Sequence, residues 1–100
     1  YNKTGCDNMK IETFLEQKYQ LIDNYKDGFE KETVDHLFTE YFLDYDYVIG
    51  DWSYGKLRLK GFCEKQNPKY NQRNDIAQKR EYLDTYCAYN CRYFVLQKVD

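Results

Sequence analysis

One stretch of the chain, residues 31–43, carries apolar side chains at the spacing of an α-helix. They recur at i, i+3, i+4, i+7 and i+8, which gathers them into one stripe along the helix surface. Glu30 is the predicted N-cap, and Phe29 and Val34 then take the two positions of a hydrophobic staple. The sequence therefore predicts a helix over about residues 31–43. The stripe consists of Val34, Leu37, Phe38, Tyr41 and Phe42.

A second and thinner apolar stripe predicts a helix over residues 76–86. Asp75, with Gln78 three residues later, has the spacing of a capping box at the start of this helix. The polar stretch before it, residues 64–74, contains Pro68, the one proline of the chain, and is predicted to be a long loop. The stripe consists of Ile76, Leu83, Tyr86 and Cys87.

Short apolar stretches around these helices are typical of β-strands. The first two are predicted to pair through a turn at Glu16 and Gln17, and two others through a turn that contains Gly55. The last stretch is apolar on both faces, which is typical of an interior strand. The predicted strands are residues 11–15, 18–25, 45–52, 56–62 and 91–99.

The order β-β-α-β-β-α-β predicts an α+β fold with a mainly antiparallel sheet of four to five strands and two helices. One hundred residues are enough for one small domain. Its core is expected to be largely aromatic, because 12 tyrosines and six phenylalanines outnumber the 16 isoleucine, leucine and valine residues. The domain is expected to span residues 10–100, with residues 1–9 as a leader or a poorly ordered N-terminus.

The register of the second hairpin follows from matching the faces of its strands, since a slip of one residue exchanges every side chain between faces. A turn at Tyr54 and Gly55 makes one face apolar and sets Asp51 opposite Arg58 on the other. On the apolar face, Gly50 is expected to leave room for a large side chain from a helix. The apolar pairs are Trp52 with Leu57, Gly50 with Leu59, and Val48 with Gly61.

The strings that carry this hairpin and the last strand resemble a known family. Residues 45–62 read YDYVIGDWSYGKLRLKGF, and residues 93–99 read YFVLQKV. Both are similar to the YutD-like family of small bacterial proteins, over roughly residues 10–99. The resemblance implies the fold given above and a location in the bacterial cytoplasm. It implies no catalytic residue and no cofactor.

The positions of the cysteines and of the one histidine give little support to catalysis or metal binding. Reduced, buried thiols are expected for Cys6, Cys63, Cys87 and Cys91, and the last two lack the C-x-x-C spacing of zinc and redox motifs. His36, the one histidine, lies beside the apolar stripe and is expected to be a half-exposed helix residue. No apolar run reaches the ~18 residues of a membrane span, so we expect no membrane partner. From the missing motifs and the family resemblance together, we expect a non-enzymatic cytoplasmic protein without a cofactor or a metal.

Charge is distributed unevenly along the chain. The net charge is −2, but residues 1–50 carry five basic and 11 acidic side chains, whereas residues 51–100 carry ten and six. Between residues 56 and 80 there are eight basic side chains against two acidic ones. Such asymmetry is a known sign of polyanion binding.

Two kinds of binding function remain open. The first is a protein-binding or regulatory module, because tyrosine and tryptophan are favoured interface anchors. The alternative is binding of single-stranded RNA or another nucleic acid through residues 56–80, in which rings stack on bases and cations contact phosphates. A cover over this sheet face by the second helix would remove the stacking surface. The candidate binding residues are Tyr47, Arg58, Lys60, Phe62, Arg73 and Arg80.

Overall fold

The computed structural model describes residues 10–86 and 91–99 of the chain. The predicted leader and the predicted thiols of Cys6 and Cys87 lie outside these residues. The strands and α-helices follow the predicted order, so the α+β fold class is confirmed. In chain order the elements are β1 (Ile11–Phe14), β2 (Gln17–Tyr25), α1 (Lys31–Leu37), the 3₁₀ helix η2 (Glu40–Asp44), β3 (Tyr47–Ser53), β4 (Lys56–Phe62), the 3₁₀ helices η3 (Gln72–Asn74) and η4 (Ile76–Gln78), α2 (Lys79–Tyr86) and β5 (Tyr93–Lys98).

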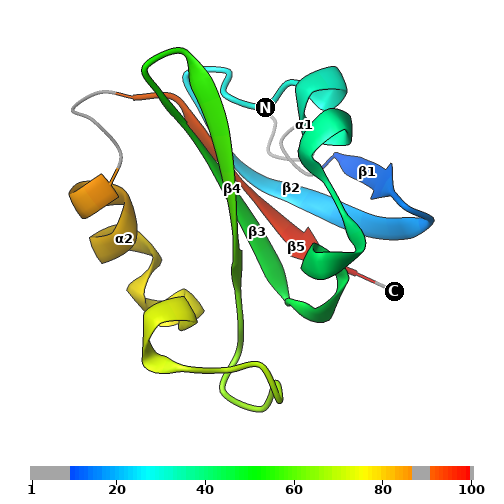
Figure 1. The fold of residues 1–100 in the computed structure, drawn as a ribbon, viewed down its shortest axis with the longest axis vertical. Coiled ribbons are helices and arrows are strands. Elements are labelled where there is room, and N and C mark those ends of the chain that lie inside the picture. Colours follow the sequence, from blue (N-terminus) through cyan, green and yellow to red (C-terminus); the bar gives the residue numbers. More distant parts are fainter. Residues whose placement is uncertain (1–9, 87–90, 100) are drawn as a thin grey trace, which may run out of the picture.

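The five strands form one antiparallel sheet in the order β1-β2-β5-β3-β4. The last strand of the chain therefore lies in the middle of the sheet, between the two hairpins (Figure 1). Phe94, Val95 and Leu96 are fully buried, which confirms the prediction of an interior strand. The first hairpin turns at Leu15 and Glu16, both with positive φ, so the predicted turn was one residue too late.

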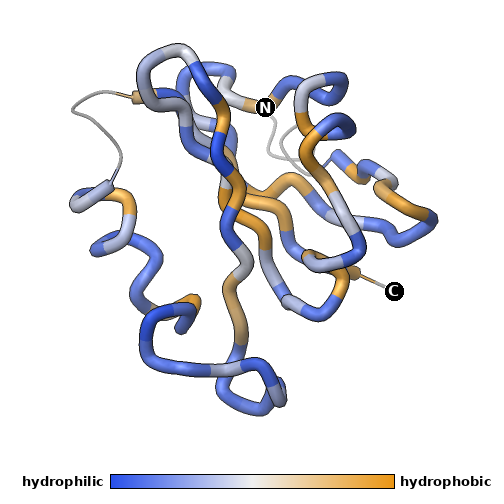
Figure 2. Tube along the Cα trace, in the orientation of Figure 1, coloured by the Kyte–Doolittle hydropathy of each residue, from blue (hydrophilic) through white to orange (hydrophobic). Residues whose placement is uncertain are grey.

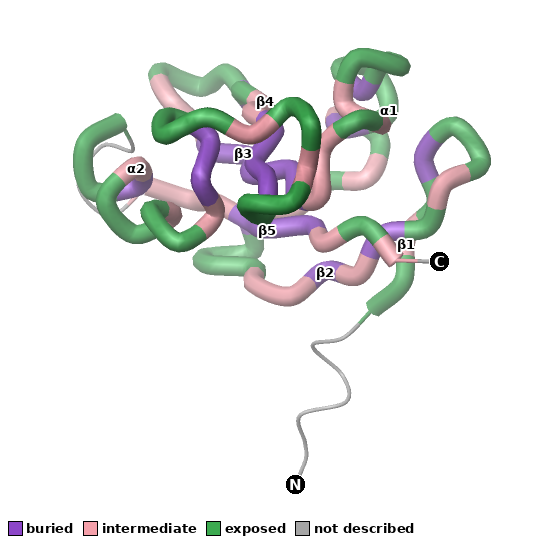
Figure 3. The backbone as a smooth tube through the Cα atoms, turned by 90° about the horizontal axis from the view of Figure 1, so that it is seen from below, coloured by how far each residue is buried: buried purple, intermediate pink, exposed green. Residues whose placement is uncertain are grey.

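The two α-helices lie on opposite faces of the sheet, and each face has its own core (Figure 1). The sheet side chains alternate between these cores along each strand. Buried backbone gathers in β3, β5 and the end of β4, whereas the long loop before α2 is hydrophilic (Figures 2 and 3). The α1 core contains Phe14, Tyr19, Leu21, Val34, Phe38, Val48, Leu57, Phe94 and Leu96, and the α2 core contains Tyr47, Ile49, Phe62, Leu83 and Val95.

The second hairpin has the predicted register. Asp51 pairs with Arg58, and Trp52 pairs with Leu57. Its turn residues Tyr54 and Gly55 have φ values of 53° and 77°, the left-handed pair that closes a two-residue hairpin and matches the twist of the strands.

Gly50 accommodates a large side chain, but that side chain comes from a strand. A Cβ atom at this position would meet the ring of Phe94 on β5, so the expectation of a helix neighbour was wrong. Gly50 and Phe94 are directly paired across β3 and β5. The missing side chain on β3 therefore makes room for the central aromatic side chain of the sheet.

The first predicted helix is interrupted. α1 ends at Leu37, Phe38 has extended backbone with φ −76° and ψ 124°, and η2 continues from Glu40. The break lets Phe38 stack on Phe14, with ring centroids 5.0 Å apart. As a consequence Tyr41 does not join the core as the stripe predicted, and its side chain is 63% exposed.

The second predicted helix begins with a 3₁₀ turn and becomes α-helical at Lys79. Asp75 is the predicted N-cap, and its carboxylate accepts a hydrogen bond from the Ala77 backbone at 2.9 Å. A full capping box occurs one turn earlier. There the Asn71 and Asn74 side chains accept reciprocal backbone hydrogen bonds.

Trp52 is half-buried against the α1 core. Its indole nitrogen donates to the Gly28 carbonyl at 2.8 Å, and the Arg92 guanidinium lies 4.5 Å from its ring centroid. Cys63 is buried and free. Cys91 is disulfide-bonded, so the expectation of reduced thiols is wrong at this position. Within the described ranges no helix is long and apolar enough to cross a membrane.

Gly50→Ala should lower the free energy of unfolding by about 1–3 kcal/mol, because the new methyl group overpacks the core against Phe94. Chemical denaturation of the wild type, Gly50→Ala, Phe94→Leu and the double variant would measure the effect. The smaller leucine should relieve part of the clash, so the double variant should lose less than the two single losses added together. Strict additivity would contradict this contact.

Candidate binding surface at the basic edge of the sheet

β4 is an edge strand, and three basic side chains follow one face of it. Lys56, Arg58 and Lys60 alternate with Leu57 and Leu59, so they share the face of the sheet that α2 covers. Arg73 of η3 lies beside them, because its carbonyl oxygen accepts a hydrogen bond from the Lys60 ammonium at 3.2 Å. We call Lys56, Arg58, Lys60 and Arg73 the basic edge.

A buried carboxylate holds Arg58 in place. Asp51 is fully buried and forms the predicted ion pair with Arg58, whose side chain is 46% exposed. The same guanidinium nitrogen donates to the Tyr86 carbonyl at 2.9 Å, which ties the end of α2 to β4. The Tyr82 hydroxyl donates to the other Asp51 oxygen at 3.4 Å. Hydrogen bonding to Asp51 raises the pKa of Arg58.

Lys60 lies over aromatic rings of the α2 core. Its ammonium is 5.1 Å from the Phe62 ring centroid and 4.9 Å from that of Tyr82. These distances are within the range of a cation–π interaction. The ring contacts and the hydrogen bond to Arg73 leave the charge at the rim of α2, where it is half-buried.

Tyr47 and Phe62 are not available as stacking rings. Phe62 is fully buried and Tyr47 is 9% exposed, and both belong to the core beneath α2. The Tyr47 hydroxyl donates to Glu64 at 2.7 Å. Of the two alternatives that the sequence left open for this face, the structure shows the one in which the second helix covers it, so the two rings are not on an open surface beside the cations.

Arg73 and Arg80, the other two predicted cations, lie on different parts of the surface. Arg73 is exposed and belongs to the basic edge. Arg80 lies on α2, where it is 3.7 Å from the Asp84 carboxylate and its guanidinium is 5.8 Å from the Tyr93 ring centroid. The structure therefore brings Arg58, Lys60 and Arg73 to β4 but leaves Arg80 on another part of the α2 surface.

Two hollows flank the basic edge, one on each face of β4. The first, of about 270 Å³, lies against α2 between Tyr82 and Tyr86. The second, of about 280 Å³, lies against η2 and includes Tyr41 and Tyr45. Lys60 and Arg73 line both hollows, so this pair of cations separates two recesses on opposite sides of one strand.

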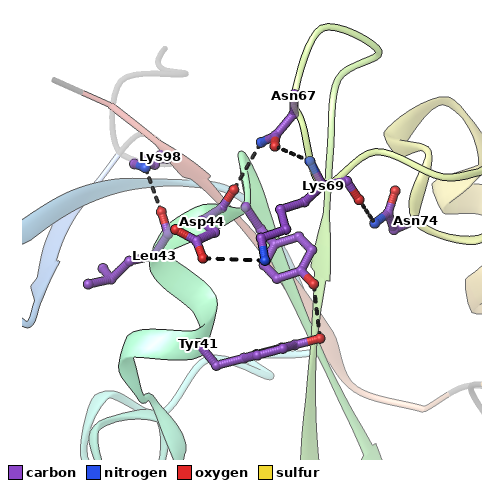
Figure 4. Close-up of polar contacts among 8 residues, drawn as sticks. Tyr41, Leu43, Asp44, Asn67, Lys69, Asn74 and Lys98 are labelled. Carbon is purple, nitrogen blue, oxygen red and sulfur yellow. Dashed lines mark hydrogen bonds and ion pairs between the residues drawn. The ribbon is translucent and has the colours of Figure 1, made fainter.

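The loop after β4 is anchored, which fixes the position of Arg73. The Asn67 amide donates to the Asp44 carbonyl at 2.9 Å, and the Asn74 amide donates to the Lys69 carbonyl at 2.9 Å (Figure 4). The Lys69 ammonium is 3.9 Å from the Asp44 carboxylate (Figure 4). The predicted long loop is thus bonded to the end of η2.

Sequence patterns missed several residues of this surface. Tyr41 was missed because the helical stripe placed it in the core, whereas its hydroxyl accepts a hydrogen bond from the Tyr45 hydroxyl at 3.0 Å. Asn71 and Asn74 had a usable signal, since two asparagines three residues apart have the spacing of a cap. That cap orders the backbone around Arg73.

Asp46 and Asp51 near this surface have partners of their own, whereas Glu81 lines the first hollow. Asp46 accepts hydrogen bonds from the Glu64 backbone at 2.8 Å and the Asn67 amide at 3.1 Å. Asp51 is bound by Arg58. His36 is exposed on α1. In the part of the chain that the structure describes, no three His, Cys, Asp or Glu residues are grouped as metal ligands would be.

Comparison with known proteins assigns the chain to a family. The family model described as "Putative antitoxin YutD-like" matches residues 13–97. The chain belongs to the YutD-like family. A curated relative from Bacillus subtilis (strain 168), named "Putative antitoxin YutD", is 42% identical over 82 residues, which cover 82% of this chain and 90% of the relative.

A solved structure agrees with the fold. The solution NMR structure of protein yutD from B. subtilis is 38% identical in sequence, with a TM-score of 0.75. The match covers 90% of this chain and 82% of that one. The resemblance seen in the hairpin and the last strand therefore extends over nearly the whole domain.

Arg58→Ala should lower the free energy of unfolding by about 3 kcal/mol, because it leaves the Asp51 charge buried without its partner. Chemical denaturation of Arg58→Ala, Asp51→Ala and the double variant would give the coupling energy between the two side chains. The double variant should lose less than the sum of the single losses. A zero coupling energy would show that the pair does not stabilise the sheet.

The protein should lose stability between pH 10 and 12. Burial is the main cause that raises the pKa of Tyr47 and of Tyr82 from the ordinary 10.0 to about 12. The unfolded chain therefore releases these protons first, and the free energy of unfolding falls as pH rises through this window. Urea denaturation and phenolate absorbance at a series of pH values would test this. Ionisation of all tyrosines in one step near pH 10 would contradict it.

Proposed function

We propose that this protein is a non-enzymatic binding module that acts through contact with another protein, and that the basic edge is its contact surface. The observation that carries the proposal is the arrangement of Lys60 and Arg73. Both line two hollows at an exposed sheet edge, and each is positioned by contacts within the domain. A surface that is ordered before binding loses less conformational entropy when a partner docks.

The family description supports an antitoxin type of module. Both the family model and the B. subtilis relative carry the word antitoxin in their names. We take the antitoxin role to be exerted by binding a partner, which agrees with a surface that combines charge, tyrosine rings and recesses. We propose accordingly that the partner is a protein whose activity this domain restrains.

RNA binding is the second candidate, and the charge pattern is what favours it. Residues 56–80 carry eight basic and two acidic side chains. However, the rings expected to stack on bases are buried in the α2 core. Binding would then depend on phosphate contacts, which are insensitive to sequence and weaken steeply with salt.

A binding experiment should separate the two candidates. The tagged domain, expressed in its native host, would be crosslinked, treated with nuclease and isolated, and each recovered protein would be purified and titrated with the domain. We expect one discrete protein partner that survives nuclease treatment. In a parallel anisotropy titration, a labelled single-stranded RNA should bind no better than ~50 μM, within the range of non-specific contacts.

A matched pair of charge reversals tests the surface. Lys56→Glu/Arg73→Glu changes the basic edge, whereas Lys10→Glu/Lys18→Glu makes the same change in net charge at exposed positions near β1 and β2. The first pair should weaken partner binding by about tenfold or more, and the second by much less. Tight RNA binding that only the first pair abolishes would replace the protein module with the nucleic-acid candidate.

A further inference from the structure

The outer backbone of β4 offers a row of hydrogen-bonding groups. The Trp52 amide donates to the Arg92 carbonyl at 3.1 Å, so it points away from β4. Its pairing partner Leu57 then directs its amide and carbonyl to the outer side, as do Leu59 and Gly61 at every second position. Among the described residues, no hydrogen bond joins the outward amides and carbonyls of these three residues to another group. An open edge of this kind is a template for another strand.

The same edge already pairs where the chain returns to it. The Cys63 amide donates to the Asn74 carbonyl at 2.7 Å, and the Cys63 carbonyl accepts from the Ile76 amide at 3.0 Å. Together they form a parallel bridge between Cys63 and Asp75. The outward amide and carbonyl of Cys63 thus have the direction that strand pairing requires. The open part of the edge is the part before Cys63.

Charge selects the kind of strand that can fill the open part. Lys56, Arg58 and Lys60 lie along it, and Arg73 stands at its end. Two copies of β4 would bring these like charges together, and like charges on neighbouring strands destabilise the pairing. Acidic side chains would instead meet Lys56, Lys60 and Arg73, while Arg58 is already paired with Asp51. Lysines on an edge strand thereby oppose self-association and favour an acidic partner.

The two hollows fit the alternation of an added strand. Successive side chains of a strand point to opposite faces, and the hollows lie on opposite faces of β4. One recess lies against α2 and is lined by Lys60 and Arg73 together with Glu81. The other has Tyr41, Tyr45 and Leu59 on its η2 side, beside the same two cations, so the rings and Leu59 can contact an apolar side chain there.

We propose that an extended acidic segment of the partner protein pairs with β4 at Leu57, Leu59 and Gly61 and directs its carboxylates toward the basic edge. This inference rests on the proposed function and specifies its partner. In this arrangement the main-chain hydrogen bonds supply the affinity and the alternate side chains supply the selectivity, as in other cases of strand addition.

Hydrogen exchange with a model peptide tests the inference directly. The probe is a labelled peptide of about ten residues, a common strand length, in which glutamate and valine alternate. On saturation the amides of Leu57, Leu59 and Gly61 should exchange more slowly by about tenfold or more. The amides of Arg58 and Lys60 should be unchanged, because they already point to β3. Equal protection at all five amides, or none, would overturn the strand-addition geometry.

Two control peptides separate backbone pairing from charge attraction. A fully backbone-N-methylated peptide keeps its carboxylates but has no amide to donate, and it should bind at least about tenfold more weakly. A valine and lysine peptide keeps the amides but reverses the charge, and it should not bind. Equal binding of the methylated peptide would reduce the site to an ion-exchange surface and overturn the inference.

Failure of the strand-addition proposal can be distinguished from failure of the proposed function. If a protein partner binds but gives no alternating protection on β4, the protein-binding module stands and the strand addition is wrong. If the peptide gives the alternating protection while only RNA is recovered from the native host, the edge is as described and the proposed function is wrong. The Lys56→Glu/Arg73→Glu and Lys10→Glu/Lys18→Glu variants supply matched controls for both titrations.

Discussion

The structure depends on the insertion of the last strand into the middle of the sheet. β5 connects the two hairpins, because it pairs with β2 on one side and β3 on the other. Its residues Phe94, Val95 and Leu96 contribute to the cores on both faces. The absence of a side chain at Gly50 makes this insertion compatible with the Phe94 ring. Until residues 93–98 are in place, neither helix has a continuous sheet face on which to pack.

The buried Asp51 joins this central packing to the surface. It lies on β3 next to β5, and its counterion Arg58 lies on the edge strand. Burying a carboxylate is unfavourable without a well-placed partner, so the ion pair constrains both the hairpin register and the position of a surface cation. Arg58 also binds the last turn of α2 through Tyr86. One interaction thereby orders a helix, a strand and part of the candidate binding surface.

The candidate function follows from how the edge of the sheet is finished. One end of β4 is covered by the return of the chain at Asn74 and Ile76, and the rest remains open and basic. α2 fills the sheet face that would otherwise present Phe62 and Tyr47. The proposed recognition therefore uses the edge of the sheet and not its face. The proposed pairing with an acidic segment would not require the buried rings.

The sequence alone determined the element order, the interior character of residues 93–96 and the hairpin register with Asp51 opposite Arg58, because these depend on local periodicity and face matching. It also identified the basic segment, since charge is visible without a fold. Only the tertiary structure decided that α1 breaks at Phe38, that Phe94 fills the space at Gly50, and that α2 covers Tyr47 and Phe62. These features depend on which elements pack together, and a helical stripe or a strand alternation carries no information about the neighbour that it meets.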